Sequence, residues 1–433
     1  MKTRALAHAA VALFSTTMIV PAAFAQQTAD APLTAIYDKP RADYDAPGIR
    51  SGGFMFKPSV TAEGKFDSNI YATDTATAPD VDDFVAIIKP SLKLDSNWNN
   101  HSLSLFADAA IAKYSDNGGE DYEDINLGAN TRFDISRGTN ITADLTYSSG
   151  HEDRGSAEPS SPVEPTTFNL FKAAVGFKRD EGKMSFAVNG DYTKQDFDNI
   201  ALGSGGNIRN DDRDRETVNG SVRIGYHMTD EYEAFAKMTL TKVNYTNPAD
   251  KGDTFRDNDG WDVVGGTAFK LTGTAEGEVF VGYVKRDYDA KSLQVGNISD
   301  FKFGASILWA PTGLTSARFA VSRDVVETSL ADNAGTQAAG ILSTLYSVDI
   351  QHELQRNLLL NAKASYTKMN FGGIARDDDL VDLGLGAKYL LNRNFSLTAD
   401  YKYAKRDAEE TGVANLNQDY KRHTFIVGLK AQW

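Results

Sequence analysis

Cysteine is absent from this 433-residue chain, and histidine is scarce. Without a thiol, the protein has no disulfide, no cysteine nucleophile and no thiolate ligand for a metal. Ser102 directly follows His101, but adjacent residues of a strand face opposite ways, so this pair cannot act as a nucleophile and its base. No Gly-x-Ser-x-Gly turn is present either. The sequence therefore predicts no enzyme, no cofactor and no metal site.

Long apolar runs and excess positive charge are also missing. Beyond residue 25 no stretch approaches the roughly 18 consecutive apolar residues of a membrane-spanning helix. The formal net charge of -14 excludes a general nucleic-acid binder, which would be basic. A mean hydropathy of -0.39 looks like that of a soluble protein, but transmembrane β-barrels share it because only alternate strand residues face lipid.

The first 25 residues differ from the rest. Lys2 and Arg4 form a short positive region, and residues 5–20 are mostly apolar. The segment ends in Ala23-Phe24-Ala25, which matches the small-x-small site of a secretory signal peptide, so we expect cleavage after Ala25. Residues 26–52 show no periodicity, and we interpret them as a periplasmic leader or a plug for a lumen.

Residues 53–433 repeat one plan of alternating apolar and polar positions, which is typical of strands with two different faces. Eight short, turn-like connections alternate with nine long, polar and acidic ones. Short periplasmic turns opposite long external loops are characteristic of outer-membrane barrels. The sequence therefore predicts an all-β, antiparallel, up-and-down transmembrane β-barrel of about 18 strands, with a range of roughly 16–20.

The final strand is the clearest example of the pattern. Phe425, Val427, Leu429 and Trp433 share one face, and Lys430 and Arg422 lie on the other. We expect this strand to pair with the strand that begins near Phe54 and so to close the barrel. We also expect its apolar face, with the terminal Trp433, to be the signal that the barrel assembly machinery reads.

The polar faces of the strands carry many charged residues, and basic residues outnumber acidic ones among those that we identify. The candidates for the lumen wall are Arg132, Arg223, Lys270, Arg318, Lys363, Lys388, Lys402, Arg422, Lys430, Asp144, Asp191 and Asp400. Rings of lysine and arginine favour anionic passengers, which predicts a pore biased towards anions. The alternative is a mixed, self-paired lumen that only keeps water inside.

One stretch resembles a known family. The run 41–54 (RADYDAPGIRSGGF), then Pro58, then 66–72 (FDSNIYA), resembles the start of the putative beta-barrel porin family type 2. Members of that family open with a similar Tyr-Asp-x-x-Gly-x-Arg-x-Gly stretch, and the first strand then ends in an aromatic, a charge and Asn. The resemblance implies an outer-membrane barrel of a Gram-negative bacterium, of a kind often found with exopolysaccharide assembly and export genes.

Two functions remain open at this point. The first is a porin-like channel that passes polar, anionic solutes, with an exopolysaccharide as the passenger that the resemblance implies. The second is a closed barrel that acts as a surface scaffold or adhesin through its long acidic loops. The expected partners are outer-membrane lipids and lipopolysaccharide, the barrel assembly machinery and, for export, polysaccharide export components.

Overall fold

The computed structural model describes residues 33–74, 78–158, 164–202, 206–246, 256–271, 273–289, 297–331, 336–410 and 419–433. The predicted signal peptide and its cleavage site near Ala25 lie outside these residues. Within them, no helix is long and apolar enough to cross a membrane.

Eighteen long strands follow one another along the chain. They are β2 (Phe54–Asp67), β3 (Asp83–Ser96), β4 (Ser102–Tyr114), β5 (Tyr122–Ser136), β6 (Thr139–His151), β7 (Thr167–Glu181), β8 (Met184–Phe197), β11 (Arg215–His227), β12 (Tyr232–Tyr245), β13 (Asn258–Leu271), β14 (Ala275–Tyr288), β15 (Ile298–Thr312), β16 (Thr315–Val326), β17 (Ile341–Gln355), β18 (Leu358–Phe371), β19 (Arg376–Leu390), β20 (Phe395–Glu410) and β21 (Tyr420–Gln432). The smaller elements are the strands β1 (Ile49–Ser51), β9 (Ile200–Ala201) and β10 (Asn207–Ile208), and the 3-10 helices η1 (Ile36–Asp38), η2 (Gly118–Glu120) and η3 (Asp211–Arg213).

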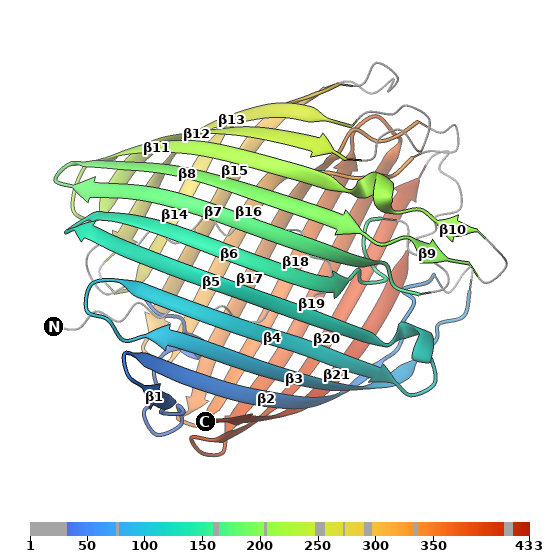
Figure 1. Cartoon of the computed structure of the whole chain (residues 1–433), viewed down its shortest axis with the longest axis horizontal. Helices are drawn as coiled ribbons and strands as arrows, with labels where there is room; N and C mark the ends of the chain where they lie inside the picture. Colours follow the sequence, from blue (N-terminus) through green and yellow to red (C-terminus); the bar gives the residue numbers. More distant parts are fainter. Residues whose placement is uncertain are drawn as a thin grey trace.

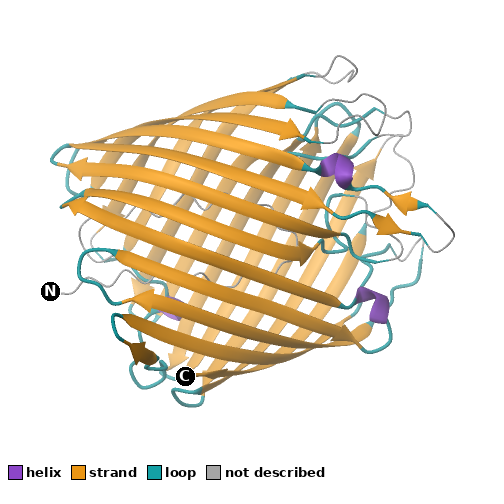
Figure 2. Ribbon diagram, in the orientation of Figure 1, coloured by secondary structure: helices purple, strands orange, loops and turns teal. Residues whose placement is uncertain are grey.

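The long strands form one closed antiparallel barrel (Figure 1). Each pairs with its neighbours in the chain, and β2 pairs both with β3 and with the last strand, β21, in register from Ser59 opposite Gln432 to Asp67 opposite Thr424. Tight turns lie at one end and long loops at the other, as Figure 2 shows. The prediction of an 18-strand barrel closed by its C-terminal strand is therefore confirmed.

Alternation along each strand separates an apolar outer face from a polar inner one. Phe425, Val427, Leu429 and Trp433 are between 44% and 63% exposed, as expected for side chains that face lipid rather than a protein core. Aromatic side chains bracket the aliphatic band, with Tyr147, Tyr283 and Tyr366 towards the loops and Trp309, Tyr389 and Trp433 towards the turns. Two aromatic girdles around an apolar band fit the two interfaces of a bilayer.

β2 and β21 form the strand pair that closes the barrel, which we call the seam. The segment Asp67-Ser68-Asn69 stabilises this seam at the loop end. The Ser68 amide donates to the carbonyl of His423 (3.0 Å), and the His423 amide donates to Oγ of Ser68 (2.8 Å). Asn69 is fully buried, and its Nδ2 donates to the carbonyls of Thr73 and Lys421 and to Oδ1 of Asp80. The Asp-Ser-Asn part of the family-like motif thus joins the two ends of the barrel wall.

The described part of the leader, residues 33–48, is anchored at the turn end of the wall formed by β16–β21. Ile36 is fully buried, and its amide donates to Oγ of Ser316 (2.9 Å). Arg41 forms an ion pair with Glu353 (2.9 Å), and the side chain of Gln432 donates to the carbonyl of Tyr44. The leader is therefore ordered against the barrel over this stretch.

We predict that Asn69→Ala weakens the seam. The substitution leaves buried hydrogen-bonding groups without a partner and should lower the free energy of unfolding by about 2 kcal/mol or more. The measurement is the temperature at which the folded barrel loses its compact mobility on unheated gels. Asn100→Ala, in an exposed turn, is the control and should leave that temperature unchanged; equal behaviour of the two variants would contradict the role of Asn69.

Candidate functional site

The inner wall of the barrel is lined by charged and polar side chains. Ion pairs that join strands which are not neighbours show that these side chains face the lumen: Arg223 of β11 contacts Glu278 of β14 (3.1 Å), and Lys302 of β15 contacts Asp262 of β13 (3.1 Å). Such pairs form only on the concave side of the wall. The barrel thus encloses a polar interior behind an apolar exterior, which is the arrangement of a water-filled pore.

The twelve candidate lumen residues all lie on the inner-face positions of their strands, but they differ in what they contact. Arg132 pairs with Asp134 (2.8 Å), Arg223 with Glu233 (3.3 Å) and Glu278, Lys363 with Asp349 (3.3 Å), and Arg422 with Asp67 and Asp153. Asp144 accepts a hydrogen bond from Asn130, and Asp191 accepts one from Asn219. Lys270 also has a polar partner, and Arg318 lies opposite Asp349 in the register of β16 and β17.

Of the basic candidates, Arg318, Lys388, Lys402 and Lys430, on β16, β19, β20 and β21, form no ion pair in the part of the chain that the structure describes. Lys388 interacts electrostatically with Lys430, and with Arg41, Asp45 and Asp38 of the leader. Lys402 interacts electrostatically with Asp400, and also with Lys65, Lys89 and Lys363. These lysines concentrate positive charge on one side of the lumen.

The interpretation of the sequence missed several acidic residues of the inner wall. Asp95 pairs with Lys57 (2.9 Å) and Lys93 (3.4 Å), and Asp180 pairs with Lys178 (3.1 Å). Most of these carboxylates lie two residues from a lysine or arginine on the same face, a spacing that alternation makes visible in the sequence. Many charges of the lumen are therefore paired, but Lys172 and Lys237 are two further inner-face lysines without an ion pair among the described residues.

A loop segment, residues 152–158, reaches from β6 to the far side of the barrel. Near its own strand, Glu152 pairs with Arg213 of η3 (2.8 Å from Nη1), and Arg154 pairs with Glu120 of η2 (2.8 Å from Nε). On the other side, Arg406 of β20 donates to the carbonyl of Ser156 (2.7 Å), and Glu158 accepts from the amide of Ser329 (3.1 Å) in the β16–β17 loop. Because β16 lies opposite β6 in the ring of strands, residues 152–158 cross the outer mouth, and we call them the crossing segment.

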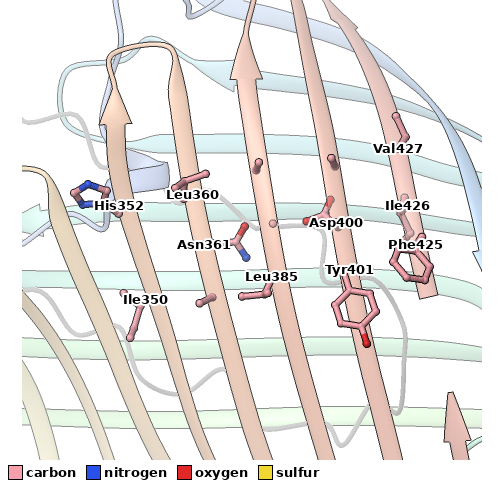
Figure 3. A pocket seen from close by; sticks show the side chains of 14 residues that line it. Ile350, His352, Leu360, Asn361, Leu385, Asp400, Tyr401, Phe425, Ile426 and Val427 are labelled. Carbon is pink, nitrogen blue, oxygen red and sulfur yellow. The ribbon is translucent and has the colours of Figure 1, made fainter. Parts of the chain in front are cut away.

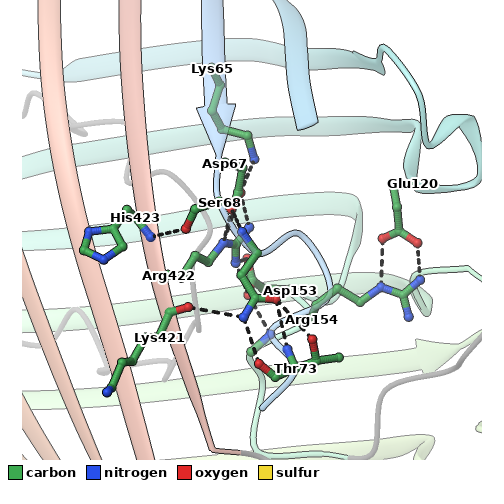
Figure 4. A network of polar contacts seen from close by, with 12 residues as sticks. Lys65, Asp67, Ser68, Thr73, Glu120, Asp153, Arg154, Lys421, Arg422 and His423 are labelled. Carbon is green, nitrogen blue, oxygen red and sulfur yellow. Dashed lines mark hydrogen bonds and ion pairs between the residues drawn. The ribbon is translucent and has the colours of Figure 1, made fainter. Parts of the chain in front are cut away.

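Arg422 ties this segment to the seam, as Figure 4 shows. Its guanidinium binds Asp67 through Nε (2.9 Å) and Nη2 (2.6 Å), and it reaches Asp153 through Nη1 (3.1 Å). Burial alone would raise the pKa of Asp153, but the charge of Arg422 and the amide of Gly155 hold it below the usual value of 3.8. Asp153 therefore stays ionised and bound to Arg422 at neutral pH.

Apolar packing reinforces the crossing. Ala157 packs against a buried cluster formed by Leu330, Ala338, Ile341, Met369, Phe371, Ile374 and Leu380 at the loop end of β17–β19. Gly155 lies so close to Tyr420 that a Cβ would come within 2.6 Å of its hydroxyl, so the tight approach depends on this glycine. The sequence predicted only a long, polar external loop here, because charged residues in such a connection give no sign of a partner across the barrel.

One hollow lies in the wall of the barrel, on its lipid-facing side. Figure 3 shows it on β17–β21, where apolar side chains such as Ile350, Leu360, Leu385 and Phe425 line it. These residues belong to the lipid-facing set, so lipid chains fill the hollow in a membrane. Inner-face residues such as Asn361 and Asp400 border it from behind, and Gly386 leaves room for these two side chains, because a Cβ there would come within 2.4 Å of each.

We predict that protonation or loss of Asp153 frees the crossing segment. A carboxyl whose pKa is depressed in the folded state stabilises that state above its usual pKa, and the contribution is lost as the pH falls through the folded value. Residues 152–158 should therefore resist limited proteolysis from pH 7 down to about 4 and become susceptible at lower pH. Asp153→Asn should be susceptible already at pH 7, whereas the exposed Asp116→Asn should behave as the parent. Protection of the Asp153→Asn variant at pH 7 would contradict the role of the Asp153–Arg422 ion pair in holding the segment.

Known proteins resemble the chain to different degrees. No curated protein matches the chain. Among solved structures, the ferric enterobactin receptor PfeA of Pseudomonas aeruginosa is 8% identical with a TM-score of 0.46, over 90% of this chain and 81% of that chain. The outer membrane protein OpdK of Pseudomonas aeruginosa is 12% identical with a TM-score of 0.42, over 87% of this chain and 99% of that chain. A family model described as putative beta-barrel porin 2 matches residues 41–433. The chain thus belongs to that family, and it is a porin-like barrel of the outer membrane.

Proposed function

We propose that this barrel is a channel for polar, anionic solutes and not an enzyme. The observation that carries the proposal is the set of three lumen lysines, Lys388, Lys402 and Lys430, which lack an ion pair among the described residues of a wall in which many charges are paired. An uncompensated positive charge in a narrow, water-filled passage lowers the energy of a passing anion and raises that of a cation. A barrel of this strand number is wide enough for an aqueous path.

The crossing segment limits what passes. It narrows the outer mouth, so small solutes fit this conformation better than a polymer does. Export of an acidic exopolysaccharide, which the family makes a natural second proposal, requires residues 152–158 to move aside. The contacts that hold the segment include ion pairs of largely buried side chains, Arg154 with Glu120 and Glu152 with Arg213, so the movement has to break several such pairs.

A closed scaffold is the alternative that the structure also favours. The leader lies at the turn end and the crossing segment at the loop end, so both mouths carry a covering element. In that case the long loops would provide the binding surface and the lumen lysines would serve no passenger. Conductance separates the two functions, because only an open path carries current.

We predict an anion-selective conductance from the purified, refolded protein in planar bilayers. In a salt gradient the reversal potential should indicate anion preference, and the triple variant K388Q/K402Q/K430Q should move it towards equal permeability. The triple variant R137Q/R179Q/R356Q makes the same charge change at exposed positions of the turn end and should leave the selectivity as it is. No conductance would favour the scaffold; an unchanged reversal potential in the lumen variant would contradict the role of the lysines.

The export proposal has its own test. Deletion of the gene should reduce the exopolysaccharide at the cell surface, and complementation with the parent gene should restore it. Surface polysaccharide that stays at its normal level in the deletion strain would end the export proposal, while leaving the solute channel intact.

A further inference from the structure

The outer face of the barrel repeats one pattern of side chains where strands approach the loops. The sequence Tyr-x-Lys-x-Asp occurs at residues 192–196 on β8, 283–287 on β14 and 403–407 on β20. In each case the tyrosine, lysine and aspartate share the outward face, because they are two residues apart on a strand. In each strand the lysine therefore lies next to the aromatic girdle, on the side nearer the long loops.

Other strands place a lysine at the same level. The outward lysines at the loop end, which we call the lysine belt, are Lys113, Lys194, Lys242, Lys285, Lys368, Lys405 and Lys421. At the turn end, by contrast, Arg179 is the one lysine or arginine on an outward position of the described barrel strands. Positive charge on the lipid-facing surface is thus concentrated at one membrane interface, the external one.

The spacing sets the depth of the belt. Two strand residues cover about 6.6 Å, so a tilted strand places the lysines roughly 5 Å beyond the tyrosines along the membrane normal. Tyrosines of the girdle lie at the level where the acyl chains meet the headgroups. The ammonium groups therefore lie among the headgroups, where phosphates are the available anions.

Lys405 and Lys421 are the two members of the belt that lie directly opposite each other on neighbouring strands. They face each other across β20 and β21, and like charges in directly opposite positions are destabilising. Asp407 pairs with Lys405 (2.5 Å), but Lys421 is exposed and forms no ion pair among the described residues. Lys368, which is also exposed, forms none either, although Asp379 lies opposite it on β19. Asp407 and Asp419 both act on Lys405, so a bound anion would chiefly neutralise the charge that remains at Lys421.

We propose that the lysine belt binds the phosphorylated headgroups of lipids in the outer leaflet, with Lys405 and Lys421 as the principal subsite. Aspartates one step further out (Asp196, Asp287 and Asp407) keep each lysine oriented along the strand and limit phosphate binding to the membrane side of the belt. The aromatic girdle beneath, with Tyr403 and His423 next to the subsite, packs against the sugar and the start of the acyl chains.

The test measures the affinity of the refolded, full-length barrel in detergent for lipid A that carries phosphates, with dephosphorylated lipid A and inorganic phosphate as separate arms. The parent should bind the phosphorylated lipid more tightly than either of the others. The variant K368Q/K405Q/K421Q should bind it about fivefold more weakly for each lysine removed, because one basic residue near an anionic surface contributes about 1 kcal/mol.

The variant R137Q/R179Q/R356Q is the matched control and should bind phosphorylated lipid A as the parent does. The mobility of unheated samples on gels shows that every variant is folded before binding is measured. Equal binding of phosphorylated and dephosphorylated lipid A by the parent, or unchanged binding by the K368Q/K405Q/K421Q variant, would overturn the proposal. Tight binding of inorganic phosphate alone would also overturn it, because the site would then recognise a free ion and not a lipid.

Discussion

The pairing of the first long strand with the last is the constraint on which the rest of this molecule depends. A bilayer offers no hydrogen-bond partner to a free backbone amide or carbonyl, so an open sheet edge in it costs several kcal/mol for each unpaired group. β2 and β21 satisfy each other from Ser59 to Asp67, which leaves the wall without an edge. Closure in turn creates an interior in which the charged inner faces can pair with one another.

Charge pairing in that interior does two different things. Within the wall, carboxylates on the same or a nearby strand neutralise many of the lysines and arginines. An example is Lys302, which contacts both Asp262 and Asp324. At the outer mouth charge pairing holds a loop segment in place, because Glu152, Asp153 and Arg154 pair with charged residues of η3, β21 and η2. The same interaction thus builds the lining of the passage and its restriction.

Much of the barrel could be predicted from the sequence, since its signals are local. The alternation of Phe425, Val427, Leu429 and Trp433 with polar neighbours depends only on strand geometry, and tight turns depend only on the residues within them. The course of Asp153 to Glu158 could not be predicted, because its partners are up to 269 positions away along the chain. The inner acids Asp95 and Asp180 were overlooked although their spacing from lysines is visible. The signal peptide and the role of the C-terminal strand in assembly stay predictions.

Arg422 binds Asp67 in the seam and Asp153 in the crossing segment, and only the contact with Asp153 can be lost while the barrel wall stays unchanged. When the segment leaves, Asp153 moves to water and is solvated there, while Arg422 keeps both of its bonds to Asp67. Arg422 itself is therefore not left as an unpaired buried ion, and at this contact the large penalty for such an ion is avoided. A barrel built in this way has a removable element at its mouth whose departure leaves the wall intact.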